Sequence, residues 1–145
     1  MSRPLQLLLS LLMALTAWQS IAAEPSAQTQ QVGRWQVHYS AIPSSFLSPS
    51  ITRQYQIERS RYNGIITLTV LDAKGVAQSV ALNAEATNLT GTRRELAFRE
   101  IKEGPAIYYL AEIPYRNEDT WRIKVALLDQ GVAHELQFMH TFYVD

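Results

Sequence analysis

The sequence contains no cysteine, and this absence excludes several kinds of chemistry. Without a thiol the chain forms no disulfide bond and offers no cysteine nucleophile. A bacterial lipoprotein needs a cysteine directly after its signal segment, so lipid anchoring of that type is excluded as well. The stability of the fold must therefore come from a packed core.

Net charge is also lacking, because 13 basic residues balance 13 acidic ones. Nucleic-acid binders usually carry a basic excess that neutralises phosphates, and no polybasic segment is present for an anionic lipid surface. We therefore expect no nucleic-acid partner. No apolar run after the first residues approaches spanning length, so we expect a soluble monomer with no membrane span once those residues are removed.

The motifs that carry catalysis are missing too. The six glycines are scattered and form no phosphate-binding loop, and no G-x-S-x-G elbow surrounds a serine. We expect no catalytic residues, no cofactor and no metal ligands. His134 and His140 lie about 20 Å apart on one strand face, too far to share an ion. His140, between Phe138 and Phe142, could be a buried base with a shifted pKa; we expect instead a core or rim histidine with one backbone hydrogen bond.

What the chain does have is an N-terminal export signal. Residues 1–4 carry one positive side chain, an apolar run follows from Leu5 to Trp18, and the small residues of Ser20-Ile21-Ala22-Ala23 suit signal peptidase. We predict a signal peptide over residues 1–23, cleaved after Ala22 or Ala23, and a periplasmic protein. Residues 24–31 are polar and are interpreted as a flexible leader.

From residue 32 onward the dominant period is two. Trp121, Ile123, Val125 and Leu127 alternate with polar positions, as in a strand with one buried face. Similar patterns predict strands at residues 33–39 and 135–144 and weaker ones at 54–60, 65–72, 78–87, 94–101 and 106–113. Seven or eight short strands predict an all-β fold, an antiparallel two-sheet sandwich of immunoglobulin-like type, as one domain over residues 32–145.

Turn signals separate these strands. Asn63-Gly64 favours a type I′ hairpin turn, and Asp72-Ala73-Lys74-Gly75 and Asp129-Gln130-Gly131 predict longer turns closed by glycine. Ser48-Pro49 predicts the start of a short helical turn that runs through Tyr55, since serine suits the N-cap and proline the first helical position.

Several blocks carry a family resemblance: residues 33–39, 43–47 with Pro49, 59–64, 98–104, 106–114 and 141–143. With these blocks in order, the stretch from about residue 32 to 145 resembles the bacterial family catalogued as domain of unknown function 4426. The family pattern leads us to expect Tyr-Gly-Ile where this chain has Tyr55-Gln56-Ile57. The resemblance implies a small exported envelope protein of Gram-negative type and assigns no activity.

Two features are candidates for binding. The loop at residues 40–49 carries Ile42, Phe46 and Leu47 between prolines and serines, and loops on rigid sandwiches commonly bind partners. We expect Phe46 and Leu47 to fold back and plug one end of the sandwich; if they do not, these three residues form the leading interaction site. Arg59 and Arg61 share a face beside Asn63-Gly64 and are candidates for contacting an anion.

The sequence therefore predicts a non-enzymatic periplasmic module that binds an envelope protein or ligand. Two alternatives stay open. One is an envelope hydrolase or metal-dependent enzyme whose site is assembled across strands. The other is a structural subunit that pairs through an edge strand, which an unpaired and uncharged edge would favour.

Overall fold

The computed structural model describes residues 28–144. The predicted signal peptide at residues 1–23, its cleavage site and residues 24–27 of the predicted leader lie outside the described residues. Among the described residues, no helix has the length and apolar character needed to cross a membrane.

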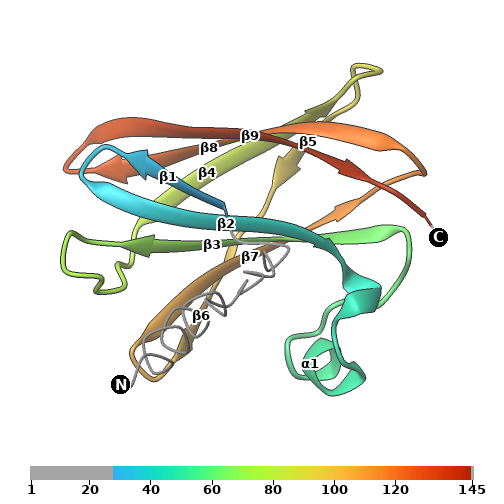
Figure 1. Ribbon diagram of the computed structural model, residues 1–145, viewed down its shortest axis with the longest axis horizontal. Coiled ribbons are helices and arrows are strands. Elements are labelled where there is room, and N and C mark those ends of the chain that lie inside the picture. Colours follow the sequence, from blue (N-terminus) through green and yellow to red (C-terminus); the bar gives the residue numbers. More distant parts are fainter. Residues whose placement is uncertain (1–27, 145) are drawn as a thin grey trace, which may run out of the picture.

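Two antiparallel sheets face each other in a sandwich (Figure 1), which confirms the predicted fold class. The strands and helices are β1 (Gln28–Val32), β2 (Trp35–Pro43), a 3-10 turn (Ser44–Phe46), α1 (Pro49–Gln54), β3 (Asn63–Leu71), β4 (Ala81–Asn88), β5 (Arg93–Leu96), β6 (Arg99–Glu103), β7 (Ala106–Pro114), β8 (Asp119–Asp129) and β9 (Val132–Phe142). One sheet has the order β1-β2-β3-β7-β6 and the other β5-β4-β8-β9.

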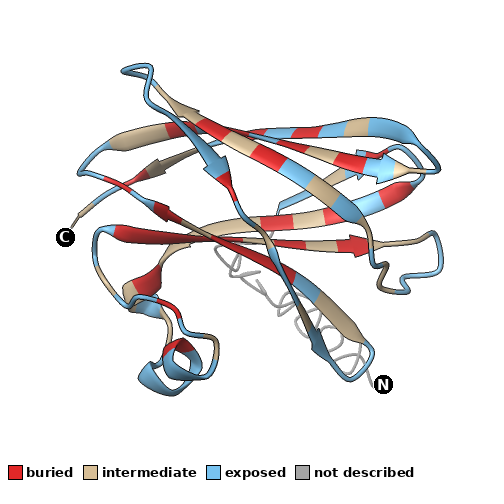
Figure 2. Cartoon of the chain, turned by 180° about the vertical axis from the view of Figure 1, so that it is seen from behind, coloured by how far each residue is buried: buried red, intermediate tan, exposed pale blue. Residues whose placement is uncertain are grey.

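The core lies between the sheets because each long strand buries one face, as Figure 2 shows for alternating residues. In β8, Trp121, Ile123, Val125 and Leu127 are buried, and Arg122 and Lys124 between them are exposed. The period-two reading of this strand is therefore confirmed, and apolar burial on both inner faces is the main source of stability.

Three local predictions were wrong. Residues 28–31, read as flexible leader, belong to β1, which pairs with β2 from Gln28↔Tyr39 to Val32↔Trp35. Residues 94–101, read as one strand, are β5 and β6 in different sheets, because the chain crosses the core between them. Residues 54–60, also read as a strand, are the end of α1 and a loop.

The predicted turn at Asn63-Gly64 was wrong as well. Both residues begin β3, and Gly64 pairs with Pro43 on one side and Ile113 on the other. Gly64 does not have a positive φ; instead, a Cβ there would meet the Phe142 ring at 2.7 Å. Glycine is therefore required at this position by close approach to a ring.

The type I′ geometry occurs at another hairpin. Gln130 and Gly131 have φ values of 51° and 81° and join β8 to β9 directly after the pair Asp129↔Val132. The helix start was predicted correctly: Ser48 is the N-cap of α1, its hydroxyl accepts from the Ile51 N–H, and Pro49 follows as the first helical residue.

The segment that contains α1 covers one end of the outer face of the five-stranded sheet (Figure 1). A second apolar cluster forms beneath it around Ile57, Ile65 and Leu110. Ser44, fully buried, holds the segment: its single O–H is shared between the carbonyls of Glu58 at 2.7 Å and Ser60 at 3.0 Å, and its oxygen accepts from the Ser60 N–H. Gln56, where the family pattern favours glycine, has a φ of 54°.

Candidate functional site

A groove of about 510 Å³ lies between β2 of one sheet and β9 of the other. We call it the β2–β9 groove. It is lined by Gln28, Tyr39, Ser40, Ala41, Ile42, Pro43, Phe46, Phe138, Met139, His140, Thr141, Phe142 and Tyr143. Its volume lies in the range of about 300–1,000 Å³ typical of ligand sites.

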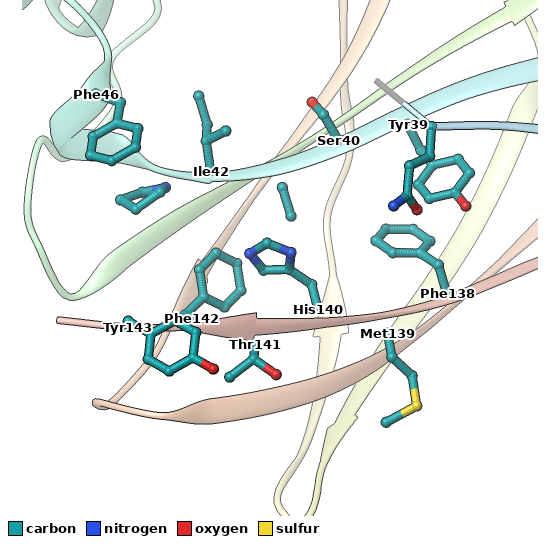
Figure 3. A pocket seen from close by; sticks show the side chains of 13 residues that line it. Tyr39, Ser40, Ile42, Phe46, Phe138, Met139, His140, Thr141, Phe142 and Tyr143 are labelled. Carbon is teal, nitrogen blue, oxygen red and sulfur yellow. The ribbon is translucent and has the colours of Figure 1, made fainter. Parts of the chain in front are cut away.

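Aromatic side chains build the floor of the groove (Figure 3). Tyr39 stacks on Phe138 with ring centroids 4.4 Å apart. Outside the lining, Tyr115 stacks on Phe142 at 4.3 Å and supports it. The His140 ring meets the Phe142 ring edge-on at 4.5 Å. Period-two geometry explains this arrangement, since Phe138, His140 and Phe142 leave the same face of β9. The floor is held rigidly by stacking.

His140 is the titratable group of the β2–β9 groove that the fold perturbs. Burial lowers the pKa of its imidazole below the ordinary value of 6.5, because the charged form loses water. The prediction of a backbone hydrogen bond to His140 was wrong. Among the described residues, its ring contacts the Phe142 ring instead. Among residues 28–144, no Asp, Glu, Lys or Arg lines the groove, so this lining is suited to uncharged, apolar groups.

Of the three candidate loop residues, Phe46 is exposed to solvent, whereas Ile42 and Leu47 are partly buried. Phe46 is 73% exposed at the groove rim, so the predicted plug was wrong for this residue. Leu47 turns inward and packs with Ile42 against the second apolar cluster. Ile42 also lines the β2–β9 groove, so the structure brings Ile42 and Phe46 to one cavity.

A second cavity of about 350 Å³ lies on the outer face of the five-stranded sheet, beside α1. Its walls include Leu47, Ile51 and Tyr55, and its polar residues include His38 and Thr69. The His38 Nδ1 lies 3.0 Å from the Thr29 hydroxyl oxygen. This cavity is smaller than the β2–β9 groove, and residues of the second apolar cluster form part of its lining.

The Arg59 side chain is hydrogen-bonded to the loop at residues 40–49. Its Nε donates to the Leu47 carbonyl and its guanidinium NH2 group to the Ser45 carbonyl, both at 3.0 Å. The two arginines also do not alternate on a strand as predicted, because residues 59–62 form the connection to β3. Arg59 therefore organises the loop, and Arg61 lies in the turn before β3.

Metal-ligating side chains do not gather within residues 28–144: no group of three or more His, Asp or Glu side chains is placed to hold an ion. His134 lies against Gly33 at the far end of β9, and a Cβ on Gly33 would meet its ring at 3.1 Å.

The β9 contribution to the β2–β9 groove was missed by sequence reasoning. The alternation of residues 136–144 predicted a strand, but nothing local indicated that its inner face would open beside β2. One signal was available in the sequence: residues 136–144 contain no Asp, Glu, Lys or Arg, which is unusual for a strand at a sheet edge.

The fold and the groove define a class: a small two-sheet β-sandwich with an uncharged, aromatic-floored groove between its sheets. Within that class the chain belongs to the family described as Domain of unknown function (DUF4426), whose pattern matches residues 29–145. The resemblance inferred from the sequence blocks is thus confirmed. No curated protein is detectably similar to the chain in sequence.

Solved structures share the fold. A DUF4426 family protein from Pseudomonas aeruginosa PAO1 is 31% identical, with 82% of this chain and 96% of that chain covered and a TM-score of 0.72. FetP of uropathogenic Escherichia coli strain F11, expressed in the periplasm of E. coli, is 9% identical over 83% and 95% of the two chains, with a TM-score of 0.54. A copper-bound variant of FetP is 9% identical over 79% and 93%, with a TM-score of 0.53. At this identity the likeness to FetP is one of fold.

Proposed function

We propose that the protein is a non-enzymatic binding module of the bacterial envelope, and that the β2–β9 groove receives apolar side chains of a polypeptide partner. One observation carries the proposal. The groove has a volume of about 510 Å³, no Asp, Glu, Lys or Arg among its described lining residues, and exposed aromatic side chains on both rims: Phe46 is 73% exposed and Tyr143 57% exposed.

The chemistry of the rim favours a polypeptide partner. Aromatic residues supply large contact areas at low entropic cost and are enriched where proteins meet. Pro43 and Pro49 bracket the Phe46 loop and restrict its unbound conformations, which reduces the cost of ordering it on docking. Phe46 is thus presented to solvent from a constrained loop.

The hydroxyl groups of the β2–β9 groove support binding over hydrolysis. A hydrolase of the serine type needs a hydroxyl that donates to a histidine base. The Ser40 hydroxyl pairs with Thr67, and the Thr141 hydroxyl with Thr120 at 2.7 Å. Neither hydroxyl is hydrogen-bonded to the His140 ring, as a serine nucleophile and its base would be.

Periplasmic location is part of the proposal. The signal-like residues 1–23 and the cysteine-free sequence support it, and the FetP structure of the same fold was obtained from periplasmic expression. The bound copper is a feature of the FetP variant and forms no part of this proposal.

The test is photocrosslinking in living cells from the groove rim. A benzophenone amino acid replaces Tyr143, and we expect it to capture a discrete envelope protein. The additional change Phe46→Ala removes the opposite rim and is expected to abolish capture. Because Phe46 is exposed, the same change should alter the free energy of unfolding by less than about 0.5 kcal/mol.

Leu89→Ala is the matched control, because Leu89 is 74% exposed at the turn between β4 and β5, away from the groove. It should leave capture intact. Capture that survives Phe46→Ala, or that Leu89→Ala removes equally, would contradict binding through the β2–β9 groove.

A further inference from the structure

The four sheet edges of the described chain are protected unequally. Edge strands β5 and β6 are short and charged, with Arg93, Arg94 and Glu95 in the first and Arg99, Glu100, Lys102 and Glu103 in the second. Edge strand β1 has five residues and is mostly polar. Natural proteins use these devices to prevent unwanted strand pairing.

Edge strand β9 is less protected, because Glu135 is its single Asp, Glu, Lys or Arg residue. It is 11 residues long, and residues 136–144 contain no Asp, Glu, Lys or Arg. Its pairing with β8 occupies one side, and the sheet order of the described chain ends at β9. Gln30 of β1 contacts the edge at Gln137, which leaves the part beyond it beside the β2–β9 groove.

The hairpin geometry identifies the backbone groups that face outward. A two-residue type I′ turn makes Asp129↔Val132 a hydrogen-bonded pair, and bonded and non-bonded pairs alternate from there. Met139 and Thr141, opposite Arg122 and Thr120, fall in non-bonded pairs. Their N–H and C=O groups therefore point away from β8. Gln137 has the same phase, and its carbonyl indeed accepts from the Gln30 side chain at 3.0 Å.

We propose that the partner docks by strand addition: an extended, uncharged segment of another polypeptide pairs with β9 through the backbone of Met139 and Thr141, and its alternate side chains enter the β2–β9 groove. This inference rests on the proposed function and adds the class of partner and its geometry. A row of free N–H and C=O groups at strand spacing is complementary to another polypeptide backbone.

Side-chain alternation sets the composition of the partner segment. One set of its side chains meets His140, Phe142 and Phe46 in the groove. The other set lies on the outer face of the sheet beside Met139 and Tyr143, which are 51% and 57% exposed. Figure 3 shows this split, with His140 directed toward β2 and Met139 directed away from it. Since residues 136–144 contain no Asp, Glu, Lys or Arg that could pair with a charged partner, the segment is apolar or neutral at both sets of positions.

The test begins with a random library of linear peptides displayed for selection on the mature protein. We expect the enriched peptides to carry apolar residues at alternate positions and few charges. One enriched peptide is then synthesised twice, unmodified and with N-methyl groups on alternate backbone nitrogens. N-methylation keeps the side chains and removes the donors, so we expect at least about a 10-fold loss of affinity.

The protein side is tested with Met139→Pro, which removes an outward N–H that no described residue uses. Proline is tolerated at such edge positions, so the fold should persist. We expect at least about a 10-fold loss of peptide affinity, and Met139→Ala, which keeps the N–H, should stay close to wild type. Glu135→Pro is the matched control, because it removes an N–H that also points away from β8 but lies outside the groove.

Hydrogen exchange gives an independent measurement. In the wild-type complex, amide exchange at Met139 and Thr141 should be slower than in the free protein.

The outcomes separate the two proposals. Strand addition would be overturned if peptide affinity fell with the protein variant Phe46→Ala but was unchanged by N-methylation of the peptide and by Met139→Pro in the protein. Groove binding would then still stand. Failure of any peptide to enrich, or enrichment that is insensitive to Phe46→Ala, would overturn both.

Discussion

At the scale of single residues, Gly64 shows how tertiary packing overrides local preference. Asn-Gly is a strong hairpin signal, yet here Asn63 donates from its side chain to the Glu58 carbonyl and to Glu112 while Gly64 passes beneath the Phe142 ring. Phe142 is itself fixed between Tyr115 and His140. The ring has little room to yield.

We therefore predict that Gly64→Ala lowers the free energy of unfolding by about 1–3 kcal/mol, the usual cost of overpacking a core. The added Cβ would lie 2.7 Å from two carbons of the Phe142 ring. Urea denaturation measures the loss. In a Phe142→Leu background the penalty should shrink, because the smaller side chain leaves space; equal penalties in both backgrounds would show that the ring is not its cause.

At the scale of elements, β9 combines the groove floor with the perturbed histidine. Burial lowers the pKa of His140 in the folded state, so the unfolded chain binds a proton more readily. The contribution of His140 to stability is therefore complete above about pH 6.5 and is lost as the pH falls through the lowered folded-state pKa. Carboxylates titrate below about pH 4.5 and do not contribute to the upper part of this window.

We predict that the urea midpoint of the wild-type protein decreases when the pH is lowered from about 7.5 to about 5.5. The decrease should be smaller in His140→Gln. His134→Gln, on the same strand face but outside the groove, is the control and should keep the wild-type dependence. A fall of unchanged size in His140→Gln would assign the pH dependence to another group.

Also at this scale, strands were easier to predict than their partners. Period two identified β8 because burial of one face imposes alternation on Trp121 through Leu127. It could not separate β5 from β6, since residues on both sides of the crossover face the same core. Ser48-Pro49 predicted the start of α1 because capping is local.

The β2–β9 groove depends on contacts that no local pattern encodes. Ile42 and His140 are nearly a hundred residues apart and belong to different sheets. The loop of Phe46 was identified from composition, but whether Phe46 or Leu47 turns inward depends on how Ser44 and Arg59 hold the loop. The sequence therefore predicted one wall of the candidate site and left the facing wall undetected.

At the scale of the whole molecule, the residues predicted to direct export are separate from those that build the described fold. The predicted signal peptide ends at residue 23, and the first strand begins at Gln28. The core is formed entirely from residues 32 onward, and without cysteine it needs no oxidation to mature. Cleavage should therefore leave the sandwich and its groove intact.

We predict that protein recovered from a periplasmic extract begins at Ala23 or Glu24, as determined by intact mass. Replacing Leu8 and Leu12 by arginine interrupts the apolar run that the export machinery requires, so this variant should stay in the cytoplasm at its full precursor mass. Both positions precede β1. A version of the variant that begins at residue 24 must therefore show the same urea midpoint as the exported protein. Full-length precursor in the periplasm of wild-type cells would refute the signal peptide, and with it the envelope location on which the proposed partner depends.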